Sequence, residues 1–254
     1  RGSLRLSNQG KEKNSGEWSP EVEAELFRCR FEGVVEEMGE LLRRTAMSPN
    51  VKERLDFSCA LLDAEGKLVV NAPHIPVHLG ALGLCVRTVS RGREWREGDM
   101  VIVNHPAFGG SHLPDVTLVS PVFIKGRLTA FVANRAHHAE IGGRTPGSMP
   151  ASACSLEEEG VVLSPELLFD GGESRFHVIE QIFRSSKYPS RMLDNNLADL
   201  SAQVAANHHG VRRMKELVGA SSHEAVIRNM RSLFHRASTV MREQLLSRVD
   251  CRWR

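Results

Sequence analysis

The sequence has few of the features that mark nucleic-acid-binding or membrane proteins. Aromatic residues make up 6% of its 254 residues, with three Trp and one Tyr, and the formal net charge is only +2. Base stacking and phosphate neutralisation, on which nucleic-acid binding depends, are therefore poorly supported. No apolar run approaches the ~18 residues that a membrane-spanning helix needs. Neither nucleic acid nor a membrane is expected as a partner.

Cysteine pairs and nucleotide motifs are also missing. The five cysteines are odd in number, scattered and without a C-x-x-C pair, which favours reduced thiols in a cytoplasmic protein over a disulfide framework. The chain has no G-x-x-x-x-G-K-[ST] loop and no G-x-G-x-x-G turn, so no phosphate cradle is visible. A G-x-S-x-G nucleophile elbow is absent too. The chemistry must therefore come from other residues.

Hydrophobic periodicity predicts a mixed α/β fold. Residues 1–19 are polar and rich in Gly, Ser and Lys, so a disordered tail is expected there. From Val22 to Thr45, apolar residues recur at helical spacing behind a Ser-Pro-Glu start, which predicts one long amphipathic helix. Further on, the pattern predicts strands at 56–62, 67–71 and 100–104 and a helix at 81–90.

The middle of the chain predicts a β-hairpin. Two apolar runs, Val116–Ile124 and Leu128–Ala133, are separated by a short turn that contains glycine. Two long helical patterns, 193–214 and 222–246, predict a C-terminal helical hairpin. The expected architecture is thus a β-sheet core with a long N-terminal helix and a C-terminal helical hairpin. Two structured regions are expected, a mixed α/β domain at 20–190 and the helical hairpin at 191–254.

The densest polar chemistry lies at the open end of the β-hairpin. His112 and Asp115 precede its first strand, and His137, His138 and Glu140 follow the second. Because antiparallel strands return to their starting point, His137 or His138 should lie beside His112 and Asp115. Two imidazoles and a carboxylate suit a divalent transition metal with open coordination positions. The alternative is that these histidines only satisfy backbone groups at the strand ends.

Several blocks carry a family resemblance. GGSHLPDVTLVSPVF, NRAHHAEIGG, PGSMP and PHIPVHLG resemble the signature blocks of the hydantoinase B/oxoprolinase family, over about residues 21–244. That family supplies one subunit of ATP-dependent hydantoinases and oxoprolinases and is related to the large subunit of acetone-type carboxylases. The resemblance marks His112, Asp115 and His137 as metal ligands. One departure is that the family's Asn-Asp-Pro reads Asn-His-Pro here, where His105 either replaces the acidic residue or faces solvent.

The resemblance implies a function with a partner. It implies a B-type subunit that hydrolyses a cyclic amide at a divalent metal (Mn, Fe or Zn), while an A-type subunit of the same hetero-oligomer uses ATP. The general base would be His138, Glu140 or His78; the last lies in a proline-rich loop that also presents His74. One alternative is a subunit of an acetone- or acetophenone-type carboxylase. Another is a non-catalytic assembly role, because family members continue beyond Gln244 and the chain is expected to be truncated.

Overall fold

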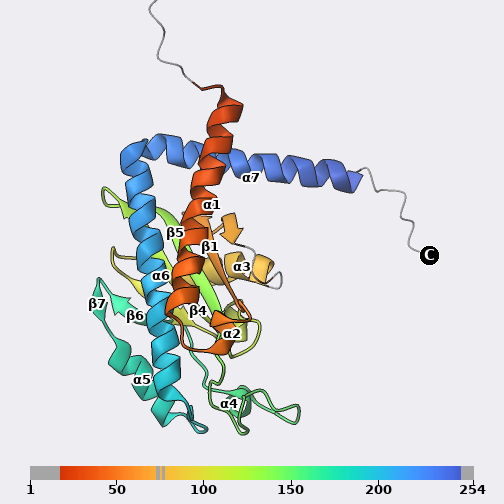
Figure 1. The fold of residues 1–254 in the computed structure, drawn as a ribbon, viewed down its shortest axis with the longest axis vertical. Helices are drawn as coiled ribbons and strands as arrows, with labels where there is room; N and C mark the ends of the chain where they lie inside the picture. Colours follow the sequence, from red (N-terminus) through yellow and green to blue (C-terminus); the bar gives the residue numbers. More distant parts are fainter. Residues whose placement is uncertain (1–17, 73–74, 76–77, 247–254) are drawn as a thin grey trace, which may run out of the picture.

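The described residues, 18–72, 75 and 78–246 of this computed structural model, form one sheet with helices on both faces (Figure 1). The seven strands follow the order β2-β1-β5-β4-β3-β6-β7, and all pairs are antiparallel. The mixed α/β fold expected from the sequence, with its long N-terminal helix and two C-terminal helices, is confirmed. Residues 1–17 of the predicted tail, and His74, lie outside the described residues.

The strands and helices have the following bounds. The strands are β1 Phe57–Asp63, β2 Leu68–Ala72, β3 Met100–Val103, β4 Asp115–Ile124, β5 Arg127–His137, β6 Glu166–Asp170 and β7 Glu173–Ser174. The helices are α1 Pro20–Thr45, α2 Pro49–Lys52, α3 His78–Ser90, the 3-10 turn η1 Pro106–Phe108, α4 Leu156–Glu159, α5 Phe176–Ser185, α6 Leu193–Ala220 and α7 His223–Leu246.

Helix α1 begins at a capped end and buries one apolar stripe. The Ser19 hydroxyl accepts a hydrogen bond from the Val22 amide at 3.4 Å, and Pro20 occupies the first turn, where its missing N–H costs nothing. The stripe packs on the sheet and α6 through residues spaced three or four apart. Its buried members are Ala24, Phe27, Phe31, Val34, Val35, Met38 and Leu42.

Strands β4 and β5 form the predicted hairpin at the centre of the sheet. Lys125 and Gly126 take positive φ values of 50° and 74°, the type I′ turn whose twist suits a two-residue hairpin loop. The register pairs Asp115 with His137 at the open end. Strand β5 is longer than the pattern indicated, because residues 134–136, which include the polar Asn134 and Arg135, pair with β1 on one side and β4 on the other. Apolar periodicity cannot detect such a strand end.

The C-terminal helices have different surroundings. Helix α6 runs along α1 and the central strands, whereas α7 turns away, crosses the N-terminal half of α1 and extends beyond the sheet (Figure 1). Exposed apolar side chains therefore gather on the distal part of α7, namely Val240, Met241, Leu245 and Leu246. Among the described helices, none combines the length and apolar character that a membrane crossing requires.

Candidate functional site

Strand β5 sends its alternating side chains to opposite faces of the sheet. Ala133 packs with Leu82 of α3 on one face, while Asn134 hydrogen-bonds residues of α6 on the other. By the same alternation His137 belongs to the α3 face and its neighbour His138 to the α6 face. The two adjacent histidines, which the hairpin spacing alone did not distinguish, therefore have different surroundings.

Four side chains meet on the α3 face, at the open end of the hairpin. We call His78, His112, Asp115 and His137 the His/Asp cluster. His112 Nδ1 lies 3.0 Å from Asp115 Oδ2, and His78 Nε2 lies 3.4 Å from the same oxygen. The rings of His112 and His137 are 4.8 Å apart, centre to centre. Asp115 is 1% exposed and His112 32%, so the cluster reaches solvent along the His112 ring.

The polar atoms of this cluster are close together without being hydrogen-bonded. Among the described residues, neither carboxylate oxygen of Asp115 nor Nδ1 of His112 has a partner in hydrogen-bonding geometry, although all three atoms are buried. A buried carboxylate without hydrogen bonds is costly. Imidazole nitrogens and a carboxylate are also the ligands that divalent transition metals accept, so the donor chemistry fits such an ion. Within the described part of the chain, however, no group of three or more His, Cys, Asp or Glu side chains is arranged so that it could hold a metal ion.

The charges of the cluster follow from burial and contact. Burial alone would raise the pKa of Asp115, but contact with His112 and His78 outweighs it and holds the pKa well below its usual range. Contact with Asp115 raises the pKa of His112, against the opposing effect of burial. Burial lowers the pKa of His137, and the nearby carboxylates, which raise this pKa, offset the effect of burial only in part. Asp115 is therefore charged, and His137 is the more readily neutral imidazole.

Two residues that the sequence analysis missed orient the histidine rings. The Asn50 side-chain amide lies 3.0 Å from Nδ1 of His137, and the Ser58 hydroxyl lies 3.0 Å from Nδ1 of His78. Each contact occupies Nδ1 of its histidine and leaves Nε2 for other contacts. Residues that hydrogen-bond the second nitrogen of a metal-ligating histidine hold the ring in the same way. Nothing in the sequence marked these residues, because 87 positions separate Asn50 from His137.

Ser58, His78 and Asp115 form a line of contacts that resembles a serine-hydrolase triad. Ser58, however, is fully buried in β1, which pairs with β2 and β5 on its two sides. A nucleophile must reach its substrate, and this hydroxyl has no access to one. The contact of Ser58 therefore serves to hold the ring of His78.

The other two candidate bases have different contacts. His138 is buried, with Nε2 2.9 Å from Gln203 Oε1 and Nδ1 3.4 Å from Asn196 Oδ1, both on α6. Glu140 is also buried, and it accepts hydrogen bonds from the Ser190 hydroxyl at 2.8 Å and the Arg191 amide at 3.1 Å. Both side chains thus anchor neighbouring segments. Of the three candidate bases, His78 is the one whose ring contacts Asp115.

The loop before β4 is held from both sides. Asn104 is buried, and its side-chain N–H groups donate to the carbonyls of Leu113 at 2.8 Å and Val161 at 2.9 Å. The next residue, His105, accepts a hydrogen bond from the Ala107 amide at 3.0 Å and so caps the η1 turn. His105 therefore has a local role in this loop, next to the Gly-Gly turn that leads to His112.

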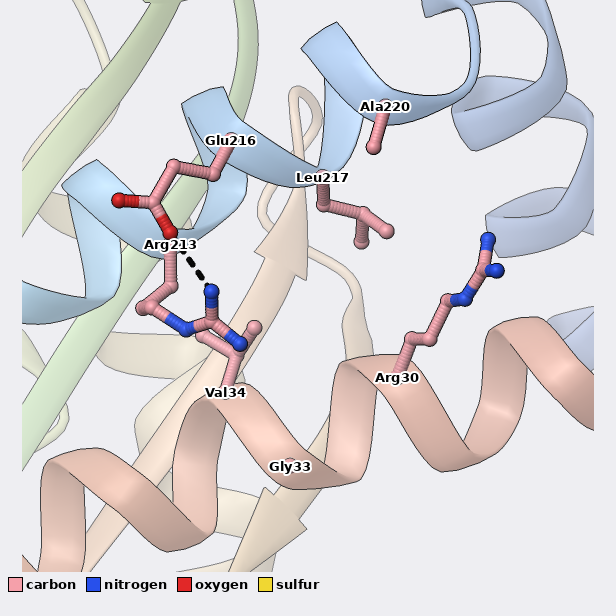
Figure 2. Close-up of a pocket in the computed structure, with 7 residues that line it drawn as sticks. All are labelled: Arg30, Gly33, Val34, Arg213, Glu216, Leu217 and Ala220. Carbon is pink, nitrogen blue, oxygen red and sulfur yellow. Dashed lines mark hydrogen bonds and ion pairs between the residues drawn. The ribbon is translucent and has the colours of Figure 1, made fainter.

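The groove drawn in Figure 2 is separate from the cluster. It has a volume of about 320 Å³ and lies between α1 and the last turns of α6, where Gly33 leaves space. The dashed contact in Figure 2 joins Arg213 to Glu216 at 2.6 Å, and Arg213 also pairs with Glu37 of α1. The pair with Glu37 links α6 to α1, the pair with Glu216 lies within α6, and partly exposed ion pairs of this kind contribute little energy. The groove is therefore a gap in helix packing.

The fold defined by this sheet and its helices is shared with solved enzymes. The ATP-dependent caprolactamase from Pseudomonas jessenii matches with a TM-score of 0.80 and 29% identity, over 91% of this chain and 39% of that one. Acetone carboxylase matches with a TM-score of 0.75 over 84% of this chain and 28% of that one, and at 18% identity this shows the fold alone. The class that these comparisons define for the chain is thus the mixed α/β fold of the two solved proteins.

The chain belongs to the hydantoinase B/oxoprolinase family, whose sequence model matches residues 20–254. It is similar to 5-oxoprolinase 1 of Arabidopsis thaliana, with 44% identity over 89% of this chain. It also resembles a putative B-type D-/L-hydantoinase subunit of Pseudomonas sp. (strain NS671), with 29% identity over 87% of this chain and 38% of that protein. The chain spans 19% of the length of the Arabidopsis relative. The resemblance seen in the sequence is confirmed.

Proposed function

We propose that this chain is the B-type part of an ATP-dependent hydantoinase or oxoprolinase and that it opens a cyclic amide at the His/Asp cluster. The observation that carries the proposal is the buried Asp115, which lies among imidazoles with both oxygens free of hydrogen bonds. The names of relatives support the substrate class, because 5-oxoproline, hydantoin and caprolactam are all cyclic amides.

A divalent metal (Mn, Fe or Zn) is part of the proposal. His112, Asp115 and His137 would hold it, and their residue types suit such an ion. When bound, the metal supplies a Lewis acid for the amide carbonyl and lowers the pKa of a coordinated water to about 7. The Asn50 contact would keep His137 in one orientation, and the exposed edge of His112 gives the substrate a way in.

We further propose His78 as the general base. Its Nδ1 contacts the Ser58 hydroxyl, so Nε2 is the ring atom that can take a proton, 3.4 Å from Asp115 Oδ2. The charge of Asp115 would stabilise the imidazolium that forms. His138 and Glu140, the other two candidates, are less suitable because their polar atoms already bind neighbouring segments.

ATP would be used by an A-type partner in a hetero-oligomer. The sequence contains no phosphate-binding loop of its own. The hydantoinase relative is named as one subunit of its enzyme, and the caprolactamase is named as ATP-dependent. In this division of labour the partner would activate the amide and this chain would complete the ring opening.

The test is an assay of the chain together with its A-type partner. We expect ATP-dependent opening of 5-oxoproline or hydantoin, and a fall in kcat of about 10²–10⁴-fold for His78→Asn, the usual contribution of a general base. His177→Asn, an exposed histidine on α5, is the matched control and should keep full activity. Bicarbonate-dependent carboxylation of a ketone in place of ring opening would replace this proposal with a carboxylase.

Metal binding is tested separately. Purified chain, freed of metal and titrated with Mn²⁺, Fe²⁺ or Zn²⁺ by calorimetry, should bind about one ion, and Asp115→Asn should bind much more weakly. Equal affinity in the two proteins would remove Asp115 from the ligand set. Failure of the wild type to bind Mn, Fe or Zn would refute the metal site.

A further inference from the structure

Arg135 is a fully buried cation at the centre of the sheet. It is the largest side chain buried to this degree, and it lies on β5 two residues before His137, on the same face. Its register partners are Thr117 on β4 and Ser58 on β1. Arg135 is thus the next side chain on this face below the His/Asp cluster, and the proposed mechanism gives it no role.

Its guanidinium is bound entirely by neutral groups. Nε donates to the Thr117 hydroxyl at 2.8 Å, and the two terminal nitrogens donate to the Ser111 hydroxyl at 3.2 Å and the Gly109 carbonyl at 2.8 Å. Arg135 forms no ion pair with any described residue. Burying a guanidinium without a carboxylate costs free energy. Since the contacts of Arg135 do not pair its charge, they must serve another purpose.

These contacts join two pieces of chain that the candidate site needs together. Gly109 and Ser111 belong to the loop that carries His112, whereas Arg135 belongs to the strand that carries His137. The loop is also packed tightly from its other side, because a Cβ on Gly110 would lie 2.5 Å from the Asn104 carbonyl oxygen. The loop therefore lies between the preceding strand end and the planar fork of Arg135.

We propose that Arg135 is a positioning residue that sets the place of His112 relative to Asp115 and His137. The inference rests on the proposed metal site. It assigns Arg135 to the support of the ligands and not to the reaction itself. Three donors in one rigid plane can define the position of a loop, which the single ammonium of lysine cannot do.

The test compares Arg135→Lys, which keeps the charge but loses the fork, with the wild-type chain. Calorimetric titration with Mn²⁺ or Zn²⁺ should show affinity reduced by about 10–100-fold, the usual effect of removing support from metal ligands. Arg87→Lys is the matched control, because Arg87 also donates to a loop carbonyl, that of Gly66 at 3.2 Å, in the turn at the opposite end of β1 from the cluster. Its affinity should equal that of the wild type.

Hydrogen exchange of the metal-free proteins supplies a readout that does not depend on metal. Arg135→Lys should speed exchange at residues 109–112 and leave the amides of β4 and β5 protected. Faster exchange throughout the sheet would mean that Arg135 has only a general structural role and would overturn the inference. Unchanged metal affinity in a folded Arg135→Lys protein would overturn it as well.

A milder variant covers the case in which Arg135→Lys does not fold. Ser111→Ala removes one acceptor from an exposed loop position and should give a smaller change of the same kind in affinity and local exchange. Wild-type values for Ser111→Ala in both measurements would then refute the inference. If the wild type binds no metal, the proposed metal site fails, and the exchange pattern alone decides the role of Arg135.

Discussion

Replacing Gln203 with leucine should strongly destabilise the protein. Its side-chain N–H groups donate to the Val116 carbonyl at 2.9 Å and to Asn134 Oδ1 at 2.8 Å, and its Oε1 lies 2.9 Å from His138 Nε2. Leucine is of similar size, so little cavity forms, but three buried polar groups lose this partner. At about 1–3 kcal/mol for each buried group left unpaired, we expect a loss of about 3 kcal/mol or more.

The loss is measured as the free energy of unfolding in urea, by fluorescence and circular dichroism together. The slope with urea should not change, so the whole effect should appear as a lower midpoint. Gln181→Leu, an exposed position on α5, is the matched control and should change stability by less than about 0.5 kcal/mol. Gln203→Leu should also weaken the packing of α6 on the central strands without detaching the helix, since its contacts cross that interface.

A double-mutant cycle with Asn134→Leu tests whether the network acts as one unit. Asn134 donates to the Gln203 backbone carbonyl and to Asn207 Oδ1, both at 2.8 Å. Because the first substitution already breaks the shared bond, the double variant should lose less stability than the sum of the single ones. The reasoning is refuted if Gln203→Leu costs under about 1 kcal/mol, the lower end of the range for one unpaired buried group, or if the two losses simply add.

Three further predictions concern the core, the cluster and its loop. Leu42→Ala, at a fully buried site on α1, should cost about 2–5 kcal/mol in urea unfolding, and clearly more than Leu41→Ala at the half-buried neighbouring position. Contact with Asp115 raises the pKa of His112 above its usual value, so the protonated imidazole stabilises the folded, metal-free protein. This stabilisation should be complete at acidic pH and lost as pH rises through the raised pKa. A difference in stability between wild type and His112→Asn that does not change with pH would contradict this. Gly110→Ala should lower both the melting temperature and metal affinity, since its Cβ would meet a backbone carbonyl at 2.5 Å, and unchanged values would show that the loop can move.

Local sequence patterns determined much of this fold. The helical spacing of apolar residues located α1 and its buried stripe, because one face of a lone amphipathic helix must be covered. The short glycine turn between two apolar runs located the β4–β5 hairpin and hence the meeting of its open ends. Family membership was also visible in the sequence, through blocks of residues around that hairpin.

The polar partners of the site were decided only by the tertiary structure. Asn50 and Ser58 reach the cluster from α2 and β1, far from His137 and His78 in sequence, and no periodicity connects them. Local patterns record burial, whereas a hydrogen bond depends on where distant segments are placed in three dimensions.

The separation of His137 from His138 shows the same limit. The two are neighbours in one short motif, but His137 ends β5 with its side chain on the α3 face, whereas His138, the next residue, contacts side-chain amides of α6. Which face lies against which helix depends on how the layers pack. The sequence by itself thus determined which residue types gather at the end of the hairpin, and the tertiary structure decided which of them share a site, because only packing assigns a face of the sheet to a neighbour.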